Sequence, residues 1–196
     1  GNTLPVGVGL ANALKLDGSE NFVYIFLGDA ATEEGVFYES LHYSKLHSLP
    51  CLFVIENNKY SVYTSLNERQ YVDLEQKIKG FDVNYFFNDN NNYKELYFQF
   101  KTIIQQLRNG KGPFVIEIMT HRYREHCGPN FDDNLNYRAN DFLLKWEKND
   151  LIDLIKNDLL KRGLTSESLE RINSQIIEEI DATYNQSRNS VLEKLG

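Results

Sequence analysis

The sequence predicts an α/β fold, in which a mostly parallel sheet is flanked by helices and followed by a helical C-terminal segment. Short apolar segments with the β-branched and aromatic content of strands alternate with helically spaced segments up to residue 119. Strands that alternate with helices require crossover connections, which favour parallel pairing. From residue 141 onward helical spacing continues while strand signals become few.

The first part of the chain predicts a helix, a strand and a second helix. Small residues over 6–13 suit a helix packed closely against a neighbour. The continuous apolar run 22–27 predicts a strand buried on both faces, and the segment 28–31 ends it. A helix is predicted over 32–47, with Glu33 and Glu34 in its first turn, where the helix dipole favours negative charge.

The middle of the chain continues the alternation. A second buried strand over 51–55 is closed by Glu56, Asn57 and Asn58. Residues 82–87 predict a third strand, with an irregular hydrophobic segment as the alternative, and a polar turn follows over 88–92. Helical apolar spacing over 93–107 predicts a helix, and a strand is expected over 114–119.

We expect one domain, with residues 1–140 forming its α/β part and residues 141–196 its C-terminal helical segment. Amphipathic helices are predicted over 150–161 and 166–181, with a shorter element after them. The chain opens at Gly1 in the middle of a tightly packed small-residue pattern, so we expect a fragment or a processed chain.

The composition excludes several classes of partner. The formal net charge is −7, so the chain has no basic field that would attract nucleic acid or anionic lipid. The longest apolar runs are too short to cross a bilayer, and no signal-peptide pattern opens the sequence. Two cysteines make no disulfide framework. We therefore expect a cytoplasmic protein that binds neither nucleic acid nor membranes.

Polar residues follow two of the predicted strands. Asp29 comes after the first strand, and Asn58 follows the second. Ligands of open α/β sheets lie beyond the carboxyl ends of the strands, and carboxylate and amide oxygens suit Mg²⁺. A helix predicted to start beside Asp29 could receive phosphate oxygens on its backbone N–H groups. The pattern therefore indicates a metal-bridged diphosphate, whereas Asp29 alone would be an ordinary strand-end residue.

The spacing of these residues carries a family resemblance. Gly28-Asp29-Ala30, then 26 residues (31–56), then Asn57-Asn58 resembles the thiamine-diphosphate motif, in which Gly-Asp-Gly and Asn-Asn lie a long fixed distance apart. Flanking segments make the chain similar to the alpha subunits of pyruvate, branched-chain 2-oxo acid and acetoin dehydrogenases, with their N-terminal part absent. These segments are residues 5–15, 31–35, 39–41, 49–50, 54–60 and 110–113.

The resemblance implies a thiamine-diphosphate-binding fold and a set of site residues. Mg²⁺ would be bound by the Asp29 carboxylate, the Asn58 amide oxygen and the backbone carbonyl of Tyr60. The cofactor-binding set would be Gly28, Asp29, Ala30, Ala31, Asn58, Tyr60, Arg122 and His126. Ala30 departs from the family, which has glycine there. Because alanine disfavours positive φ, it fits only if that position needs close approach rather than a left-handed backbone.

The loop after the last predicted strand supplies the catalytic candidate. Residues 120–129 resemble the Thr-Tyr-Arg-Tyr-His-Gly-His-Ser loop of the same subunits, and His126 falls on the histidine that assists acyl transfer there. Arg124 and Glu125 replace His-Gly, and Cys127 replaces a serine that kinases modify in some relatives, so phosphorylation control of that type is not expected. A solvated surface loop is the alternative for His126.

The resemblance also implies a function and partners. The chain would belong to an enzyme that decarboxylates a 2-oxo acid on thiamine diphosphate and passes the acyl group to a lipoyl acyltransferase. A beta subunit would supply the glutamate that activates the cofactor, so the chain alone should be inactive. Two alternatives are a related thiamine-diphosphate enzyme of polysaccharide or secondary metabolism with a non-lipoyl acceptor, and a degenerate subunit without catalysis.

Overall fold

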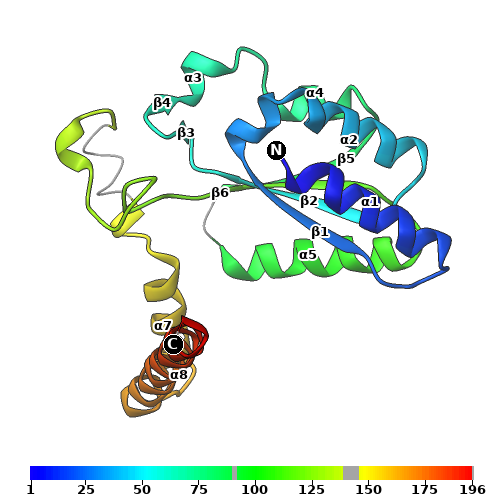
Figure 1. Ribbon diagram of the computed structural model, residues 1–196. Helices are drawn as coiled ribbons and strands as arrows, with labels where there is room; N and C mark the ends of the chain where they lie inside the picture. The colour runs from blue at the N-terminus through cyan, green and yellow to red at the C-terminus, as the bar shows by residue number, and fades with distance from the viewer. Residues whose placement is uncertain (90–91, 139–145, 196) are drawn as a thin grey trace. The chain divides into compact units, whose positions relative to one another are not determined.

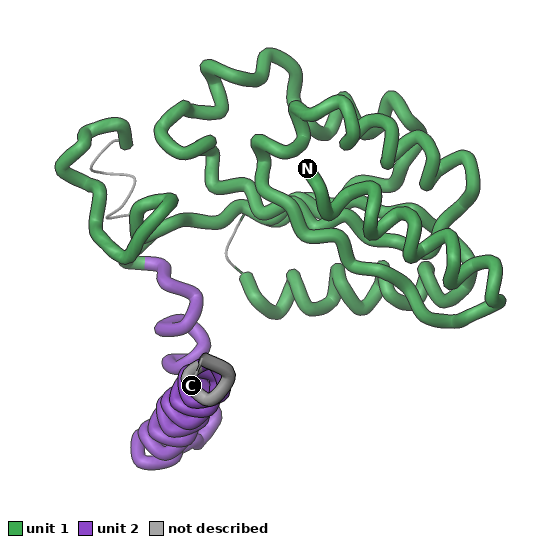
Figure 2. Tube along the Cα trace, viewed as in Figure 1, with its two compact units in different colours: residues 1–148 green, residues 149–196 purple. Residues whose placement is uncertain are grey.

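The computed structural model describes residues 1–89, 92–138 and 146–195. The chain divides into two compact units, residues 1–148 and 149–196, which are coloured separately in Figure 2. The predicted boundary at 140/141 and part of the predicted turn over 88–92 lie outside the described residues. Among the described helices, none is both long and apolar enough to cross a membrane.

The first unit is built on a four-stranded parallel sheet with the order β1-β2-β6-β5 (Figure 1). Its strands are β1 Val23–Gly28, β2 Cys51–Asn57, β5 Asn84–Asn88 and β6 Phe114–Met119. Gly28 lies opposite Glu56, so the polar ends of β1 and β2 leave the same edge of the sheet side by side. The predicted α/β class with a parallel sheet is confirmed.

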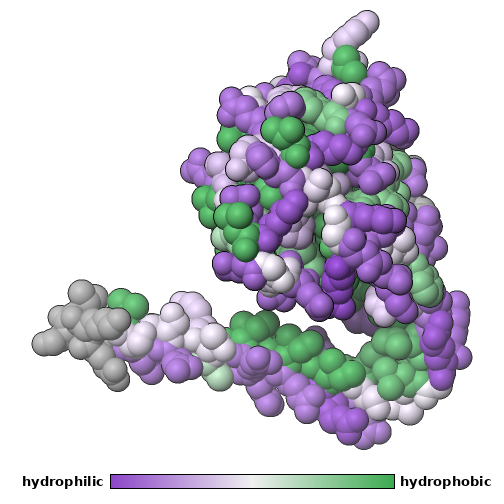
Figure 3. Space-filling model, turned by 90° about the vertical axis from the view of Figure 1, so that its right-hand side faces the viewer, coloured by the Kyte–Doolittle hydropathy of each residue, from purple (hydrophilic) through white to green (hydrophobic). Residues whose placement is uncertain are grey.

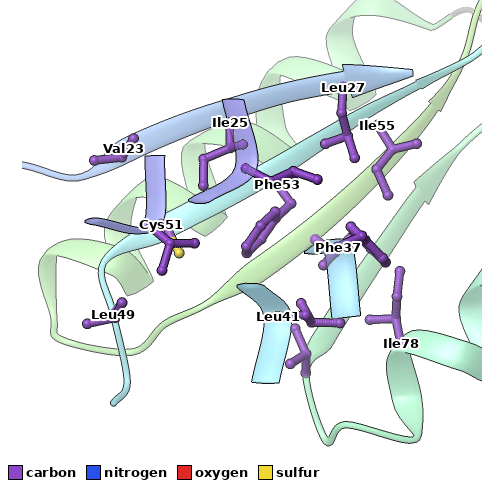
Figure 4. Packing of buried hydrophobic residues seen from close by; sticks show 14 of the residues in the cluster. Val23, Ile25, Leu27, Phe37, Leu41, Leu49, Cys51, Phe53, Ile55 and Ile78 are labelled. Carbon is purple, nitrogen blue, oxygen red and sulfur yellow. The ribbon is translucent and has the colours of Figure 1, made fainter. Parts of the chain in front are cut away.

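Helices cover both faces of this sheet. Helices α1 Thr3–Leu16, α2 Gly35–Leu46 and α4 Leu74–Lys79 pack on one face, and α5 Tyr93–Arg108 packs on the other. Phe37 and Leu41 of α2 lie against the sheet residues Phe53 and Ile55 in the larger core cluster (Figure 4). All four are fully buried, which makes this cluster the main source of hydrophobic stability.

The small residues of α1 allow it to approach the sheet closely, as predicted. A Cβ on Gly7 would lie 2.5 Å from Cγ1 of Ile25, which is closer than real carbon atoms approach. Gly112 is similarly confined, because a Cβ there would lie 2.2 Å from the carbonyl oxygen of Leu49. Both glycines therefore permit contacts that any larger residue would prevent.

The connection between β2 and β5 contains elements that the sequence patterns did not predict. A short hairpin, β3 Tyr60–Ser61 and β4 Thr64–Ser65, leads into the one-turn helix α3 Leu66–Arg69. A capping box starts α3, in which the Glu68 carboxylate accepts hydrogen bonds from the backbone N–H and the hydroxyl of Ser65. This connection brings Arg69 back over the end of β1.

Two predictions about the region of β1 and α2 are wrong. β1 lies at the edge of the sheet and is buried on one face only. On its other face Tyr24 contacts Phe100 of α5, with ring centroids 6.2 Å apart, but Tyr24 and Phe26 remain 39% and 54% exposed. The helix predicted over 32–47 begins later, at Gly35. Residues Asp29–Glu33 instead form a 3₁₀ turn, η1, which the extended backbone of Glu34 separates from α2.

The second unit consists of helices α7 Leu151–Lys161 and α8 Ser166–Leu195. The sequence predicted a break after residue 181, but α8 continues as one helix of 30 residues. The apolar residues of α8 recur at helical spacing, and a hydrophobic strip runs along one side of the second unit (Figure 3). The exposed members of this strip on α8 are Ile172, Ile176, Ile177, Ile180, Tyr184 and Val191.

Candidate functional site

Asp29 is the first residue beyond β1 and is 2% exposed. Its carboxylate accepts a charged hydrogen bond from the Arg69 guanidinium, which also pairs with Glu33. The side chains of Arg69 and Asp29 are 9% and 3% exposed, so this ion pair is shielded from water. A buried carboxylate is tolerated only with a cation or several donors, and here α3 provides the cation.

Gln70 reinforces this contact from the residue after α3. Its Nε2 atom donates to the carbonyl oxygen of Asp29 at 3.3 Å, to Oγ1 of Thr32 at 3.1 Å and to Oε1 of Glu33 at 2.9 Å. The Thr32 hydroxyl itself donates to the Asp29 carbonyl at 2.6 Å. Arg69 and Gln70 therefore connect the segment after β4, by an ion pair and hydrogen bonds, to the 3₁₀ turn that begins at Asp29.

Asn58 lies in the tight turn between β2 and β3, and Tyr60 is the first residue of β3. The Asn58 Oδ1 atom accepts a hydrogen bond from the backbone N–H of Tyr60 at 2.9 Å. Lys59 between them has a left-handed backbone, with φ of 66°. An amide oxygen has two lone pairs, so Asn58 keeps one for a further partner. The predicted metal ligands Asp29 and Asn58 thus follow neighbouring, in-register strands.

The backbone at Ala30, where the family has glycine, does not have a positive φ. The described residues with positive φ are three glycines and Ser48, Lys59, Val62, Asp82 and Asn136. Ala30 lies with Ala31 in the 3₁₀ turn that starts at Asp29. The backbone at this position is therefore one that alanine adopts without strain.

A cavity of about 300 Å³ lies beside Asp29 at the carboxyl ends of the strands. Asp29, Asn57, Tyr85 and Glu117 line it from four different segments. Glu117 was not singled out from the sequence, although a carboxylate within the apolar run 114–119 is an available signal. Arg69 could not have been found in that way, because the hairpin that positions it was not predicted.

Arg122 lies next to the turn between β3 and β4. Its Nη2 atom donates to the carbonyl of Val62, between β3 and β4, at 3.1 Å and to the Tyr137 hydroxyl at 2.9 Å. The Tyr137 ring contacts that of Tyr60 edge to face, with centroids 5.4 Å apart. The Nε and Nη1 atoms of Arg122 are buried without a hydrogen-bond partner within the described part of the chain.

Asp132 organises the rest of the loop. This buried carboxylate pairs with Arg138 and accepts a hydrogen bond from the Tyr137 hydroxyl at 2.6 Å, and it lies 3.6 Å from Nη2 of Arg122. Burial, with the positive charges of Arg138 and Arg122, lowers the pKa of His121 to about 4. His121 is therefore neutral at physiological pH.

His126 is exposed, farther along the loop. Its neighbours hold the loop together, since Arg124 donates to the carbonyl of Pro129 at 3.0 Å and lies 3.7 Å from the centre of the Phe131 ring. The Glu125 carboxylate accepts from Nδ2 of Asn130 at 2.7 Å. Asp29 and Asn58 thus lie beyond neighbouring strands at one edge of the sheet, and Arg122 contacts the hairpin that Tyr60 begins. His126 lies on the loop after Arg122.

The chemistry of these residues fits a divalent cation and a diphosphate. The Asp29 carboxylate already holds a cationic group, and the Asn58 oxygen is a second hard ligand. The unpartnered N–H groups of Arg122 are donors of the kind that phosphate oxygens accept. Within residues 1–89, 92–138 and 146–195, no cluster of three His, Cys, Asp or Glu side chains forms a metal site.

Comparisons with known proteins give one consistent result. The model of the dehydrogenase E1 component family matches residues 1–194. The pyruvate dehydrogenase E1 component subunit alpha of Rickettsia typhi is 32% identical over 194 residues, which cover 98% of this chain and 59% of that protein. The same-named subunit of Staphylococcus aureus is 30% identical, over 94% of this chain and 52% of its own. The chain therefore spans little more than half the length of these relatives.

Proposed function

The chain belongs to the dehydrogenase E1 component family, and we propose that it forms the Mg²⁺- and diphosphate-binding part of the alpha subunit of a thiamine-diphosphate-dependent 2-oxo acid dehydrogenase. The observation that carries this proposal is the buried carboxylate of Asp29, which follows a strand paired in register with the strand that ends in Asn57-Asn58. In this structure Arg69 neutralises that carboxylate, and in the proposal Mg²⁺ takes over this role. The relatives are named as pyruvate dehydrogenase E1 alpha subunits.

In this proposal each residue has a defined task. Asp29, Asn58 and the carbonyl of Tyr60 hold Mg²⁺, which anchors the diphosphate. The backbone N–H groups of Ala30 and Ala31, which follow Gly28, would donate to the diphosphate oxygens, and the N–H groups of Arg122 would add positive charge. Bound thiamine diphosphate supplies the electron sink for loss of carbon dioxide from the 2-oxo acid.

His126 is the proposed catalytic residue. Its exposure leaves the side chain accessible to a second substrate, and imidazole is the side chain that most often serves as a general acid or base. The ordered contacts of Arg124 and Glu125 fix the loop on which it lies. In this proposal His126 acts on the reacting group from this loop.

The partners follow from the same family. A beta subunit supplies the glutamate that activates the cofactor, a lipoyl acyltransferase accepts the acyl group, and the enzyme is cytoplasmic. We expect this chain without its beta partner to be inactive. We expect residues of both subunits to set the choice of 2-oxo acid. Pyruvate is the first substrate to test, because the relatives are named as pyruvate dehydrogenase subunits.

A second candidate keeps the cofactor but changes the acceptor. Arg124 and Glu125 depart from the family's loop and make contacts of their own with Pro129 and Asn130. This observation favours a related thiamine-diphosphate enzyme whose acceptor is not lipoamide. A degenerate subunit is less favoured, because the backbone at Ala30 has no positive φ that would exclude alanine.

Calorimetric titration of the assembled alpha and beta subunits with thiamine diphosphate tests the proposal. Binding should require Mg²⁺ and should be lost in Asp29→Asn, whereas the surface change Asp17→Asn should leave it intact. Decarboxylation of pyruvate and transfer to a lipoyl domain are then measured on the same sample. Decarboxylation without lipoyl transfer would favour the second candidate, and the absence of any Mg²⁺-dependent binding would refute both.

A further inference from the structure

Glu117 is a buried carboxylate to which the proposed chemistry assigns no role. It lies on β6 opposite Ile55 of β2 and is 6% exposed. Its Oε1 atom accepts a hydrogen bond from Nδ2 of Asn57 at 2.5 Å, and its Oε2 atom accepts one from the Tyr85 hydroxyl. A buried carboxylate is costly, so its position in an otherwise apolar strand calls for an explanation.

The contact with Asn57 determines which way that amide faces. The Glu117 Oε1 atom is the acceptor in this contact, so the Asn57 amide turns its NH₂ group toward Glu117. Its Oδ1 atom then faces the opposite way and accepts from the backbone N–H of Lys59 at 2.8 Å. The reversed amide would place two donors against each other at Lys59 and leave the Glu117 oxygen unpaired.

The bond to Lys59 in turn fixes the turn that carries the proposed metal ligands. Lys59 has a left-handed backbone that costs a non-glycine residue free energy and needs support. Two successive hydrogen bonds to side chains supply it, because the Lys59 N–H donates to Asn57 Oδ1 and the Tyr60 N–H donates to Asn58 Oδ1. The Asn57 carbonyl also accepts from the Thr120 backbone N–H at 2.9 Å.

Tyr85 holds Glu117 from the other side. Burial and the hydrogen bond to Glu117 raise the pKa of this phenol well above its usual range, so its hydroxyl stays a donor. Tyr85 belongs to β5, Glu117 to β6 and Asn57 to β2, and all three line the cavity that contains Asp29. Three strands are thus linked by side chains at the edge where the site lies.

We propose that Glu117 is a positioning residue, which orients the Asn57 amide and thereby sets the turn that presents Asn58 and Tyr60 to the cation. This inference rests on the proposed function, since it assigns a role toward the same site. A positioning role for Glu117 differs from a purely structural role in one respect. The presence of a hydrogen-bond acceptor at position 117, rather than the volume or the charge of that side chain, should determine the geometry of the turn at Lys59.

Three variants of the full-length alpha subunit separate these roles. Glu117→Gln keeps an acceptor for Asn57 and offers its NH₂ group to the Tyr85 oxygen. Glu117→Leu fills a similar volume without an acceptor. Tyr85→Phe is the matched control, because it removes a bond to Glu117 but leaves the Asn57 contact in place.

Two measurements are made on each variant. Hydrogen exchange of the Lys59 amide reports the turn without any cofactor, with the Phe53 amide in the centre of β2 as the internal reference. Mn²⁺ binding followed by electron paramagnetic resonance, in the assembled protein with thiamine diphosphate, reports the site. In Glu117→Leu, exchange at Lys59 should rise and the Mn²⁺ dissociation constant should increase, each about tenfold, as expected for the loss of ~1.4 kcal/mol. Glu117→Gln and Tyr85→Phe should both stay within about threefold of wild type, a difference of less than ~1 kcal/mol.

Several results would overturn the inference. They are an unchanged Lys59 exchange in Glu117→Leu, equal losses in Glu117→Leu and Glu117→Gln, or faster exchange at Lys59 with unaltered Mn²⁺ affinity. If wild-type protein bound no Mn²⁺, the proposed function would fail and the assigned role toward the cation with it. The exchange measurement would still decide separately whether Glu117 holds the turn, so the two failures are distinguishable.

Discussion

Replacing Arg69 by glutamine removes the cation that neutralises the buried carboxylate of Asp29. The two side chains are 9% and 3% exposed, and breaking a buried ion pair by removing one partner costs ~3–5 kcal/mol. The second partner, Glu33, is 32% exposed, so that contact adds no more than ~1 kcal/mol. Because glutamine can still donate one hydrogen bond to Asp29, we expect Arg69→Gln to lower the free energy of unfolding by about 3 kcal/mol.

A divalent cation should reverse much of this loss. If Mg²⁺ binds the freed carboxylate only in the folded state, a concentration of 100 times its dissociation constant stabilises the protein by ~2.7 kcal/mol. Wild-type protein should respond less, since Arg69 must first leave Asp29. The assay is urea unfolding of each protein, with and without MgCl₂, against NaCl of equal ionic strength.

Two controls make this test specific. Arg108→Gln removes an exposed arginine at the end of α5 and should change stability by less than ~0.5 kcal/mol. The double variant Asp29→Asn with Arg69→Gln removes both charges, so it should lose less than Arg69→Gln alone and ignore Mg²⁺. A stable Arg69→Gln protein, or a Mg²⁺ response that persists in the double variant, would refute the reasoning.

Three further predictions concern packing, the motif and pH. Gly7→Ala should lower the free energy of unfolding in urea by ~1–3 kcal/mol, because its Cβ would lie 2.5 Å from Cγ1 of Ile25. Gly9→Ala is the control, since a Cβ there meets open space and should not destabilise the protein. Equal effects of the two changes would contradict the close packing of α1 on the sheet. Ala30→Gly should change the dissociation constant of thiamine diphosphate by less than about threefold in calorimetry, because φ there is not positive, and a large gain would contradict this. Burial lowers the pKa of His121 to about 4, so the unfolded chain takes up a proton first, below its own pKa of roughly 6.5. Stability should therefore be complete above pH 6.5 and fall by roughly 1–2 kcal/mol toward pH 4, allowing for partial exposure, and His121→Gln should flatten this decline if the assignment holds.

The strands and their polar ends could be predicted because both are local signals. A short apolar run bounded by Gly28 or by Asn57-Asn58 is visible in a few residues, and parallel pairing follows from the intervening helices. The two-sided burial of β1 was wrong for a related reason. Tyr24 and Phe26 have the composition of a central strand, but composition does not reveal that the strand lies at the sheet edge.

The contacts that complete the site are not local, which is why the sequence did not disclose them. Arg69 reaches Asp29 across 40 positions, and Glu117 reaches Asn57 across 60. The contact of Arg69 with Asp29 depends on the β3–β4 hairpin, and the contact of Glu117 with Asn57 depends on the register of β2 and β6. Hydrophobic periodicity predicts neither feature. The start of α2 was misplaced because the apolar and acidic residues after Asp29 suit a 3₁₀ turn as well as a helix, and the extended backbone of Glu34 decides between them.

The most direct test of the central claim is a crystal structure of the assembled protein with Mg²⁺ and thiamine diphosphate. We predict that the Asp29 carboxylate, the Asn58 amide oxygen and the Tyr60 carbonyl oxygen each lie at about 2.1 Å from the metal, with the Arg69 guanidinium displaced from Asp29. A cofactor bound elsewhere, or bound with Arg69 still paired to Asp29, would contradict the assignment of this sheet edge as the cofactor site.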